Sequence, residues 1–294
     1  MKQIFTFLFL FLLVVSLSLN LFSQTIGTDA GTKKLELEVS GGIALIHGHD
    51  NFYNRISGTN ELIDQYAQYY NLTSTLTGDE VQKIKSLIPL NLSLNYKFSQ
   101  SLCIKIGFEY SSGKTFTQQQ HLVKWNGLTE TYHYDYDYRI SSLMPYLGVE
   151  TRFSSFGVYT NVGFNITDFS FTQTMQYEED GVLLLQEDET YDTRGKTIAF
   201  TLGGKYMLKI GRKLKLLLKL EYLYLNINSF KGEKKRNNDT VEGTIYTYEL
   251  NPYGTGGFEY WDLHETEPDG AGIKNVDTLG IDLSCVRIMI GFSF

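Results

Sequence analysis

Proline, cysteine and positive charge are all in short supply in this 294-residue chain: it has 4 prolines and 2 cysteines, and its net charge is −7. The acidic balance argues against a nucleic-acid-binding protein, which would carry a basic patch or stripe. Tyrosine (21) and phenylalanine (19) are abundant, and aromatic enrichment favours strands over helices. With 42% hydrophobic and 20% charged residues, the composition is that of an ordered chain.

Motifs that would indicate an enzyme or a cofactor site are also missing from the sequence. It has no glycine-rich phosphate loop and no paired-cysteine metal site, and spacing fixes no Ser/His/Asp set. In "HGHD", His47 and His49 could share a metal, but no third ligand is evident and a surface loop is favoured. A hydrolase or protease at a barrel rim would need His47 or His133 to converge with Asp or Ser. We therefore predict a non-enzymatic protein with no cofactor, no catalytic residue and no metal site.

The N-terminal segment has the features of an export signal. Lys2 precedes an almost wholly apolar stretch over residues 4–19, and small or polar residues follow near Ser23 and Gln24. This pattern predicts a secretory signal peptide over residues 1–24, with an uncleaved membrane anchor as the alternative. Because no cysteine follows the apolar stretch, a lipoprotein is not indicated.

Alternation of apolar and polar residues with a period of two dominates the rest of the chain, and it predicts strands. At the C-terminal end, for example, Val286, Ile288 and Ile290 alternate with Arg287 and Met289. Eight such segments are evident: residues 35–45, 88–98, 102–110, 143–153, 158–166, 198–208, 214–222 and 285–294.

The connections between these segments alternate in length. Short turns are expected near residues 99–101, 154–157 and 211–212. Long excursions cover residues 48–84, 112–141, 168–197 and 229–280, and "ELIDQYAQYY" in the first of them is compatible with a short helix. Residues 243–250 and 256–264 could add two strands and make ten, but charged residues interrupt both. We expect them to form an external hairpin.

Alternation alone leaves the direction of the apolar face open, because a soluble barrel would place Leu90, Ile106 and Leu218 inside. Three features favour apolar residues on the outside: charges of both signs share the polar face, aromatics lie at the ends of the apolar zones, and long loops alternate with short turns. The polar face would then fill the barrel with ion pairs, and a gated polar conduit is the alternative. The residues expected to form this interior charge network are Glu109, Glu221, Lys205, Arg287, Glu150 and Arg152.

The ending "VRIMIGFSF" resembles the C-terminal signature that the outer-membrane assembly machinery recognises, with Phe294, Phe292 and Ile290 as the insertion signal. With the eight alternating segments, the chain resembles the small outer-membrane barrels of the OmpA-transmembrane, OmpX and OmpW type. The resemblance implies an all-β fold, a closed antiparallel up-and-down transmembrane barrel with long extracellular hairpins and short periplasmic turns. It also implies one barrel domain over residues 25–294, location in the cell outer membrane, and outer-membrane lipid and the assembly machinery as partners.

Two further residue sets carry expectations. In "TYHYDYDYR" the side chains of Tyr132, Tyr134, Tyr136 and Tyr138 share one strand face, which suits either cross-strand packing or a surface-binding stripe. The two cysteines lie on strands far apart around an eight-stranded wall, so we predict two free thiols.

From these features we predict a structural, adhesive or recognition role at the cell surface, with an extracellular ligand or surface partner. The alternative is OmpW-like transport of a small or apolar ligand across the outer membrane.

Overall fold

The computed structural model describes residues 35–46, 50–99, 101–125, 127–211, 214–237, 239–254 and 256–294. The predicted signal peptide and the "HGH" of the possible metal motif lie outside these residues.

The elements run along the chain as β1 (Leu35–Ile46), a short 3₁₀ helix (Asp50–Tyr53), α2 (Asn54–Tyr69), β2 (Thr73–Gly78), β3 (Ser86–Lys97), β4 (Leu102–Trp125), β5 (Leu128–Phe153), β6 (Phe156–Glu179), β7 (Val182–Lys209), β8 (Lys215–Tyr224), β9 (Asn226–Ile227), β10 (Lys231–Arg236), β11 (Asp239–Leu250), β12 (Phe258–His264), β13 (Ile273–Thr278), β14 (Ile281–Asp282) and β15 (Cys285–Ser293).

Eight antiparallel strands close into a ring. Their order is β1, β3, β4, β5, β6, β7, β8 and β15, and β15 pairs with β1 to complete the circle. A closed ring leaves no unpaired sheet edge within its wall, which is the condition for placing strands in hydrocarbon. The prediction of an eight-stranded up-and-down barrel is confirmed, and each ring strand covers one of the eight alternating segments to within one residue.

The apolar residues of the ring face outward and the polar residues face inward. On β1, Leu37 and Ile43 are exposed while Glu38 between them is completely buried. Along β5 the outward apolar residues run from Phe153 to Leu143. At about 3.4 Å per residue and a tilt of about 40°, that stretch is roughly 26 Å tall, close to the apolar band of a transmembrane barrel. This exposed apolar belt is stable only against lipid, so the soluble barrel is excluded.

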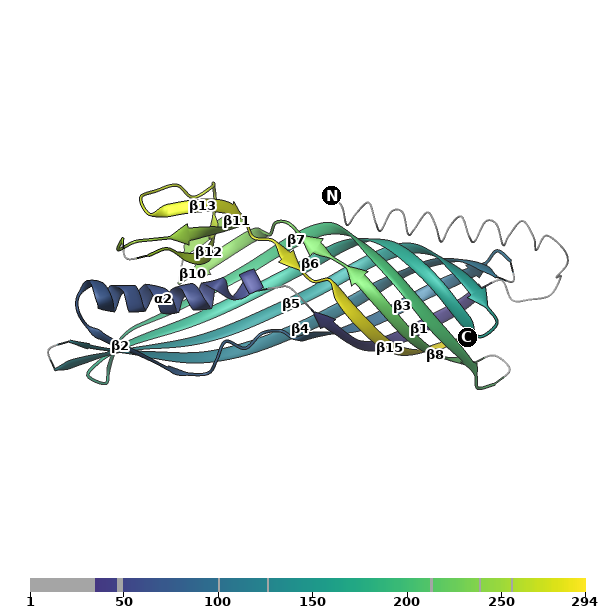
Figure 1. Ribbon diagram of the computed structural model, residues 1–294, viewed down its shortest axis with the longest axis horizontal. Helices are drawn as coiled ribbons and strands as arrows, with labels where there is room; N and C mark the ends of the chain where they lie inside the picture. The colour runs from purple at the N-terminus through teal and green to yellow at the C-terminus, as the bar shows by residue number, and fades with distance from the viewer. Residues whose placement is uncertain are drawn as a thin grey trace.

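Strands β4–β7 are far longer than the membrane requires. They contain 24, 26, 24 and 28 residues, whereas about 9–11 cross a bilayer. Beyond the ring they continue together as an open, curved sheet, extended on one side by β10, β11 and β12 (Figure 1). The segments over 243–250 and 256–264 therefore form an external hairpin, as expected. The C-terminus lies at the opposite end of the molecule, with the short turns.

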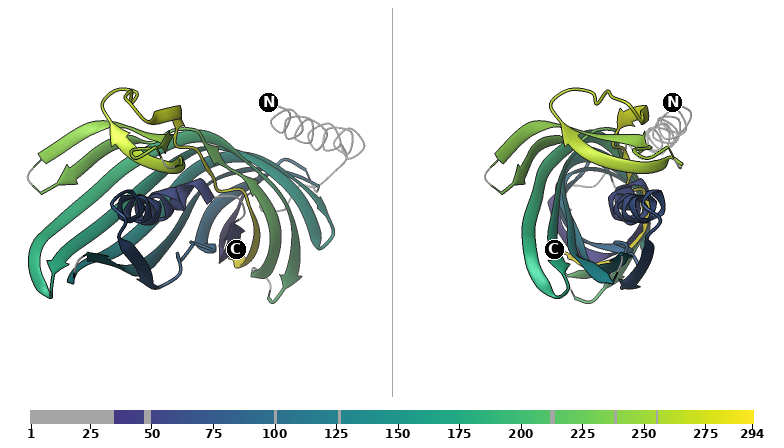
Figure 2. Two further views of the ribbon diagram at one scale, coloured as in Figure 1. Left: turned by 60° about the vertical axis from the view of Figure 1, so that its left-hand side comes forward. Right: turned by 90° about the vertical axis from the view of Figure 1, so that its left-hand side faces the viewer.

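Helix α2 lies along the inner, concave side of the extended sheet, as the end-on view shows (Figure 2). It contacts β12, β2 and β4. Its span is longer than the 61–70 segment that suggested a helix, since it begins at Asn54. In the described residues no helix is both long and apolar enough to span a membrane.

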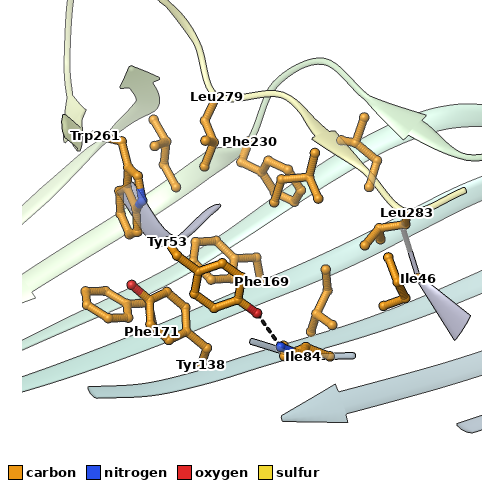
Figure 3. Close-up of a cluster of buried hydrophobic side chains, with 14 of the residues drawn as sticks. Ile46, Tyr53, Ile84, Tyr138, Phe169, Phe171, Phe230, Trp261, Leu279 and Leu283 are labelled. Carbon is orange, nitrogen blue, oxygen red and sulfur yellow. Dashed lines mark hydrogen bonds between the residues drawn. The ribbon is translucent and has the colours of Figure 1, made fainter. Parts of the chain in front are cut away.

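A hydrophobic core fills the space between α2, the extended sheet and the chain returning to β15. Its members come from distant parts of the sequence, including Ile46, Tyr53, Ile84, Phe169, Phe230, Trp261, Leu279 and Leu283 (Figure 3). All are at most 7% exposed. The Tyr53 hydroxyl accepts a hydrogen bond from the backbone N–H of Ile84, which fastens the start of α2 to the segment before β3. The extracellular part is thus a packed roof over the barrel.

Candidate functional sites: barrel interior, roof and exposed tip

The barrel interior holds two clusters of buried ion pairs. The first surrounds Glu38 of β1, whose carboxylate pairs with Lys205 of β7 and lies 3.3 Å from the ammonium of Lys219 and 3.5 Å from that of Lys105. Glu150 of β5 lies 2.7 Å from the same Lys205 ammonium. Because these strands lie on different sides of the ring, the side chains bridge its interior.

The side chain of Arg152 extends this first cluster toward the end of the barrel that carries the short turns. Its guanidinium lies 2.5 Å from Glu150 and 2.5 Å from Glu36. Two lysines at the rim, Lys97 and Lys215, approach the Glu36 carboxylate at 2.8 and 2.7 Å. Every inward carboxylate of the cluster therefore has more than one cationic neighbour, which offsets the cost of removing it from water.

The second cluster is built on Arg287 of β15. Its guanidinium pairs with Glu109 of β4 and lies 2.5 Å from Glu221 of β8. The Tyr159 hydroxyl donates a hydrogen bond to Glu221, which places an aromatic ring between the two clusters. Lys105 also lies 4.0 Å from the centre of that ring. All six predicted interior residues thus lie inside the barrel in ion pairs, and the arrangement is a charged plug.

A third cluster, built on the buried Arg55 of α2, holds the roof together. Its guanidinium lies 2.5 Å from Glu189 and 3.5 Å from Asp262, and it donates to the Trp261 carbonyl oxygen at 3.0 Å. Four aromatic rings surround it within 4.8–5.6 Å, those of Phe171, Tyr191, Tyr260 and Trp261. A cation in such a cage combines charge pairing with cation–π attraction. Sequence reasoning missed this site because Arg55 lies more than 100 residues from every other member.

The tyrosine stripe of β5 lies inside the molecule. Tyr136 and Tyr138 are completely buried and Tyr134 is 5% exposed, whereas Tyr132 is half-buried. Tyr134 and Tyr136 stack with ring centres 5.8 Å apart, and Tyr138 packs on Phe171 at 4.5 Å. The packing interpretation therefore describes the stripe. The surface-binding alternative is wrong for its buried members, because α2 covers the face that a bare hairpin would expose.

The residues of the C-terminal signal lie on the outer wall. Ile290, Phe292 and Phe294 are 57%, 42% and 53% exposed, and the backbone N–H of Phe294 donates to the Leu37 carbonyl oxygen. Cys285 is the first residue of β15 and lies at the extracellular end of that strand. Both cysteines are buried and free, as predicted.

Exposed apolar residues gather at the extracellular tip, far from the membrane belt. The hairpin between β6 and β7 carries Val182, Leu183, Leu184 and Leu185, which are 60%, 51%, 54% and 42% exposed. The tip of the β4–β5 hairpin lies beside it, joined by hydrogen bonds between Thr129 and Asp180, and it presents Trp125 at 52% exposure. We call these two hairpin ends the apolar tip. Four consecutive apolar residues without alternation were the sequence signal for it.

In the part of the chain that the structure describes, no cluster of three or more His, Cys, Asp or Glu residues could hold a metal. His121 is buried and its imidazole Nε2 lies 2.8 Å from the Asn60 side-chain oxygen on α2. Burial lowers its pKa, so the ring is neutral at pH 7. His133 lies 3.9 Å from Glu178 on the neighbouring strand.

No protein-family model and no curated protein matches the chain. Among solved structures, the outer membrane protein OprG from Pseudomonas aeruginosa matches at 16% identity, over 90% of this chain and 96% of that one, with a TM-score of 0.34. Ail, the attachment invasion locus protein of Yersinia pestis, solved with the heparin analogue sucrose octasulfate, matches at 10% identity over 89% and 100%, with a TM-score of 0.35. Neisserial surface protein A matches at 8% identity over 90% and 98%, with a TM-score of 0.28. The chain is thus similar to small outer-membrane β-barrels, while the fold itself is established by the closed ring and the apolar belt.

Proposed function

We propose that this outer-membrane β-barrel protein is a non-enzymatic surface recognition or adhesion protein whose contact site is the apolar tip. The exposed Val182–Leu185 run carries the proposal. Soluble surfaces rarely keep contiguous apolar residues in water unless they bind something. The barrel anchors the hairpins that carry the tip, the charged plug fills the barrel interior, and the roof stiffens the hairpins, so that this surface stands well away from the membrane.

The charge around the tip indicates the kind of partner. Glu178, Glu179 and Asp180 immediately precede the apolar run, and Glu187 and Asp188 follow it. Arg236 compensates one of these carboxylates, that of Glu187, at 2.5 Å. An apolar centre with an acidic rim suits a protein surface that is apolar in its middle and basic at its edge. It would repel an anionic membrane.

The experiment is adherence of cells that display the protein to surfaces coated with a basic or an acidic protein. Replacing all four residues of the Val182–Leu185 run by serine should reduce adherence to the basic coat severalfold, and added salt should weaken the remainder. Leu76→Ser on the free edge of β2, where Leu76 is 45% exposed, is the matched control. Unchanged adherence by the four-serine variant, at equal surface display, would contradict the proposal.

The transport alternative has one observation in its favour. The β1–β3 ladder is interrupted between the pairs Gly41–Leu90 and Ala44–Leu87, at Pro89, which has no backbone N–H to donate. A small apolar ligand leaving sideways would need such a weak seam. Pro89→Ala should then slow uptake of an apolar probe such as naphthalene by cells, relative to Pro145→Ala at the comparable interruption between β5 and β6. Equal uptake by both variants would exclude a route through this seam.

A further inference from the structure

A groove of about 1010 Å³ crosses the outer wall where the long strands leave the apolar belt. Its outward side chains come from β3–β7 and β10, and include Lys114, Arg139 and Arg194. They lie on the same strand faces as the lipid-facing residues, because Arg139 is an even number of positions from Leu143 and Arg194 from Ile198. The groove is therefore on the face that meets lipid and outside the packed roof.

Strand register fixes the level of the groove. Tyr110, Leu143 and Ile166 are paired across β4, β5 and β6 as an outward apolar row. Two residues closer to the extracellular end of each strand, the next row of paired residues is Ser112, Ser141 and Asp168. This step, roughly 7 Å along the strands, is where hydrocarbon ends and headgroups begin. The groove thus opens at headgroup level with apolar side chains directly beneath it.

The groove is cationic in a protein that is acidic overall. Lys114, Arg139, Arg194 and Lys231 line it, against two carboxylates, Asp168 and Asp192. Arg194 lies 2.6 Å from Asp168 and Arg139 lies 2.6 Å from Asp137. Both arginine side chains are more than half exposed, so these attractions are weak and easily exchanged for a phosphate. In the described parts of the chain no ion pair engages the ammonium of Lys114 or Lys231. The local excess of positive charge contrasts with the net charge of −7.

We propose that this groove binds the phosphorylated headgroup of an outer-leaflet lipid, with its acyl chains along the apolar row below. The guanidinium groups of Arg139 and Arg194 supply planar pairs of donors that match phosphate oxygens, and Lys114 and Lys231 supply further charge. The apolar residues alone would accept any lipid. The cations above them select a lipid that carries phosphate.

The test is native mass spectrometry of the full-length protein in detergent, titrated with a synthetic diphosphorylated lipid A or its dephosphorylated form. We compare the variant Lys114→Gln/Arg139→Gln/Arg194→Gln with the wild type. Removing a basic residue at a membrane surface weakens binding roughly fivefold, so the triple variant should lose about 100-fold for the phosphorylated lipid. Binding of the dephosphorylated lipid should be weak and unchanged.

A matched variant with the same loss of charge, Lys124→Gln/Lys235→Gln/Lys274→Gln, removes three exposed lysines outside the groove. It should bind the phosphorylated lipid as the wild type does. Inorganic phosphate is the third ligand tested. If millimolar phosphate displaces the phosphorylated lipid from the wild type, the groove is an anion site with no lipid selectivity, and the proposal is overturned. Equal losses in the two triple variants would also overturn it. Because the groove lies far from the apolar tip, loss of lipid binding with normal adherence would leave the proposed function intact.

Discussion

At the scale of single residues, the barrel interior depends most on Arg287, which is 1% exposed and pairs with two buried carboxylates. Arg287→Met would remove the cation that forms salt bridges with both Glu109 and Glu221. Losing one partner of a buried ion pair costs about 3–5 kcal/mol, so the free energy of unfolding should fall by about that amount in urea titrations of the folded barrel in detergent.

The control for this prediction removes the charges together. Arg287→Met combined with Glu109→Gln and Glu221→Gln leaves no unpaired ion and should recover much of the lost stability. Lys235→Met, at an exposed pair with Glu233, should have little effect. If Arg287→Met alone unfolds at the wild-type urea concentration, the plug does not stabilise the barrel.

Alternation of residues predicts which side chains enter the barrel but not which charges meet. It placed Glu109, Glu150 and Arg287 inside because a strand has a period of two. Pairing depends on strand tilt and stagger, which no single segment encodes. Lys205, for example, binds Glu38 and Glu150, whereas Arg287 binds Glu109 and Glu221 in the other cluster, and alternation alone does not separate the two sets. Arg55 was missed altogether, since nothing in its own segment distinguishes it from a solvent-exposed arginine.

At the scale of elements, α2 is fastened to β12 through Asp262 and Arg55. Burial acts to raise the pKa of the Asp262 carboxyl, but Arg55 and Lys234 outweigh it and hold that pKa below its ordinary value of 3.8. A lowered pKa in the folded state means that folding favours the carboxylate. The attachment should therefore hold at pH 5–7 and loosen as the pH falls below about 4 through the folded-state pKa.

Hydrogen exchange of α2 and β12 between pH 7 and pH 3 measures this loosening, after correction for the intrinsic exchange rate. Asp262→Asn should exchange faster than the wild type at pH 7 and show little further change on acidification. Protection of α2 that stays constant down to pH 3 in the wild type would contradict the role of the carboxylate.

A second element-scale prediction concerns the end of β15. If Phe294 is part of an insertion signal, Phe294→Ser should lower the yield of assembled barrel severalfold, measured as the unboiled band that shifts on heating in SDS gels. Phe98→Ser is the matched control, since Phe98 is 55% exposed against 53% for Phe294 and also lies at the short-turn end. Barrels that do assemble should unfold alike in both variants. Equal yields would show that Phe294 contributes only lipid contact.

The elements within the membrane could be predicted from the sequence, and those outside it largely could not. Lipid imposes one rule on every ring strand, apolar outward and polar inward, and closure follows from it. Outside the membrane the sheet has water on one face and α2 on the other, so the inward face of β5 changes from polar to aromatic. Alternation places Tyr136 on the inward face, but the burial of that face depends on a helix that packs there from another part of the chain.

At the scale of the whole molecule, two filled levels block a path along the barrel axis. The ion-paired plug occupies the membrane level, and the hydrophobic core beneath α2 closes the extracellular mouth. An eight-stranded barrel has room for little more than its own side chains. The protein in planar lipid bilayers should therefore give no stable unitary conductance at moderate voltage. Replacing Arg287, Glu109 and Glu221 by alanine should not open a channel either, because the roof remains. Stable current steps in the wild type would mean that plug and roof move apart, and they would favour the transport alternative.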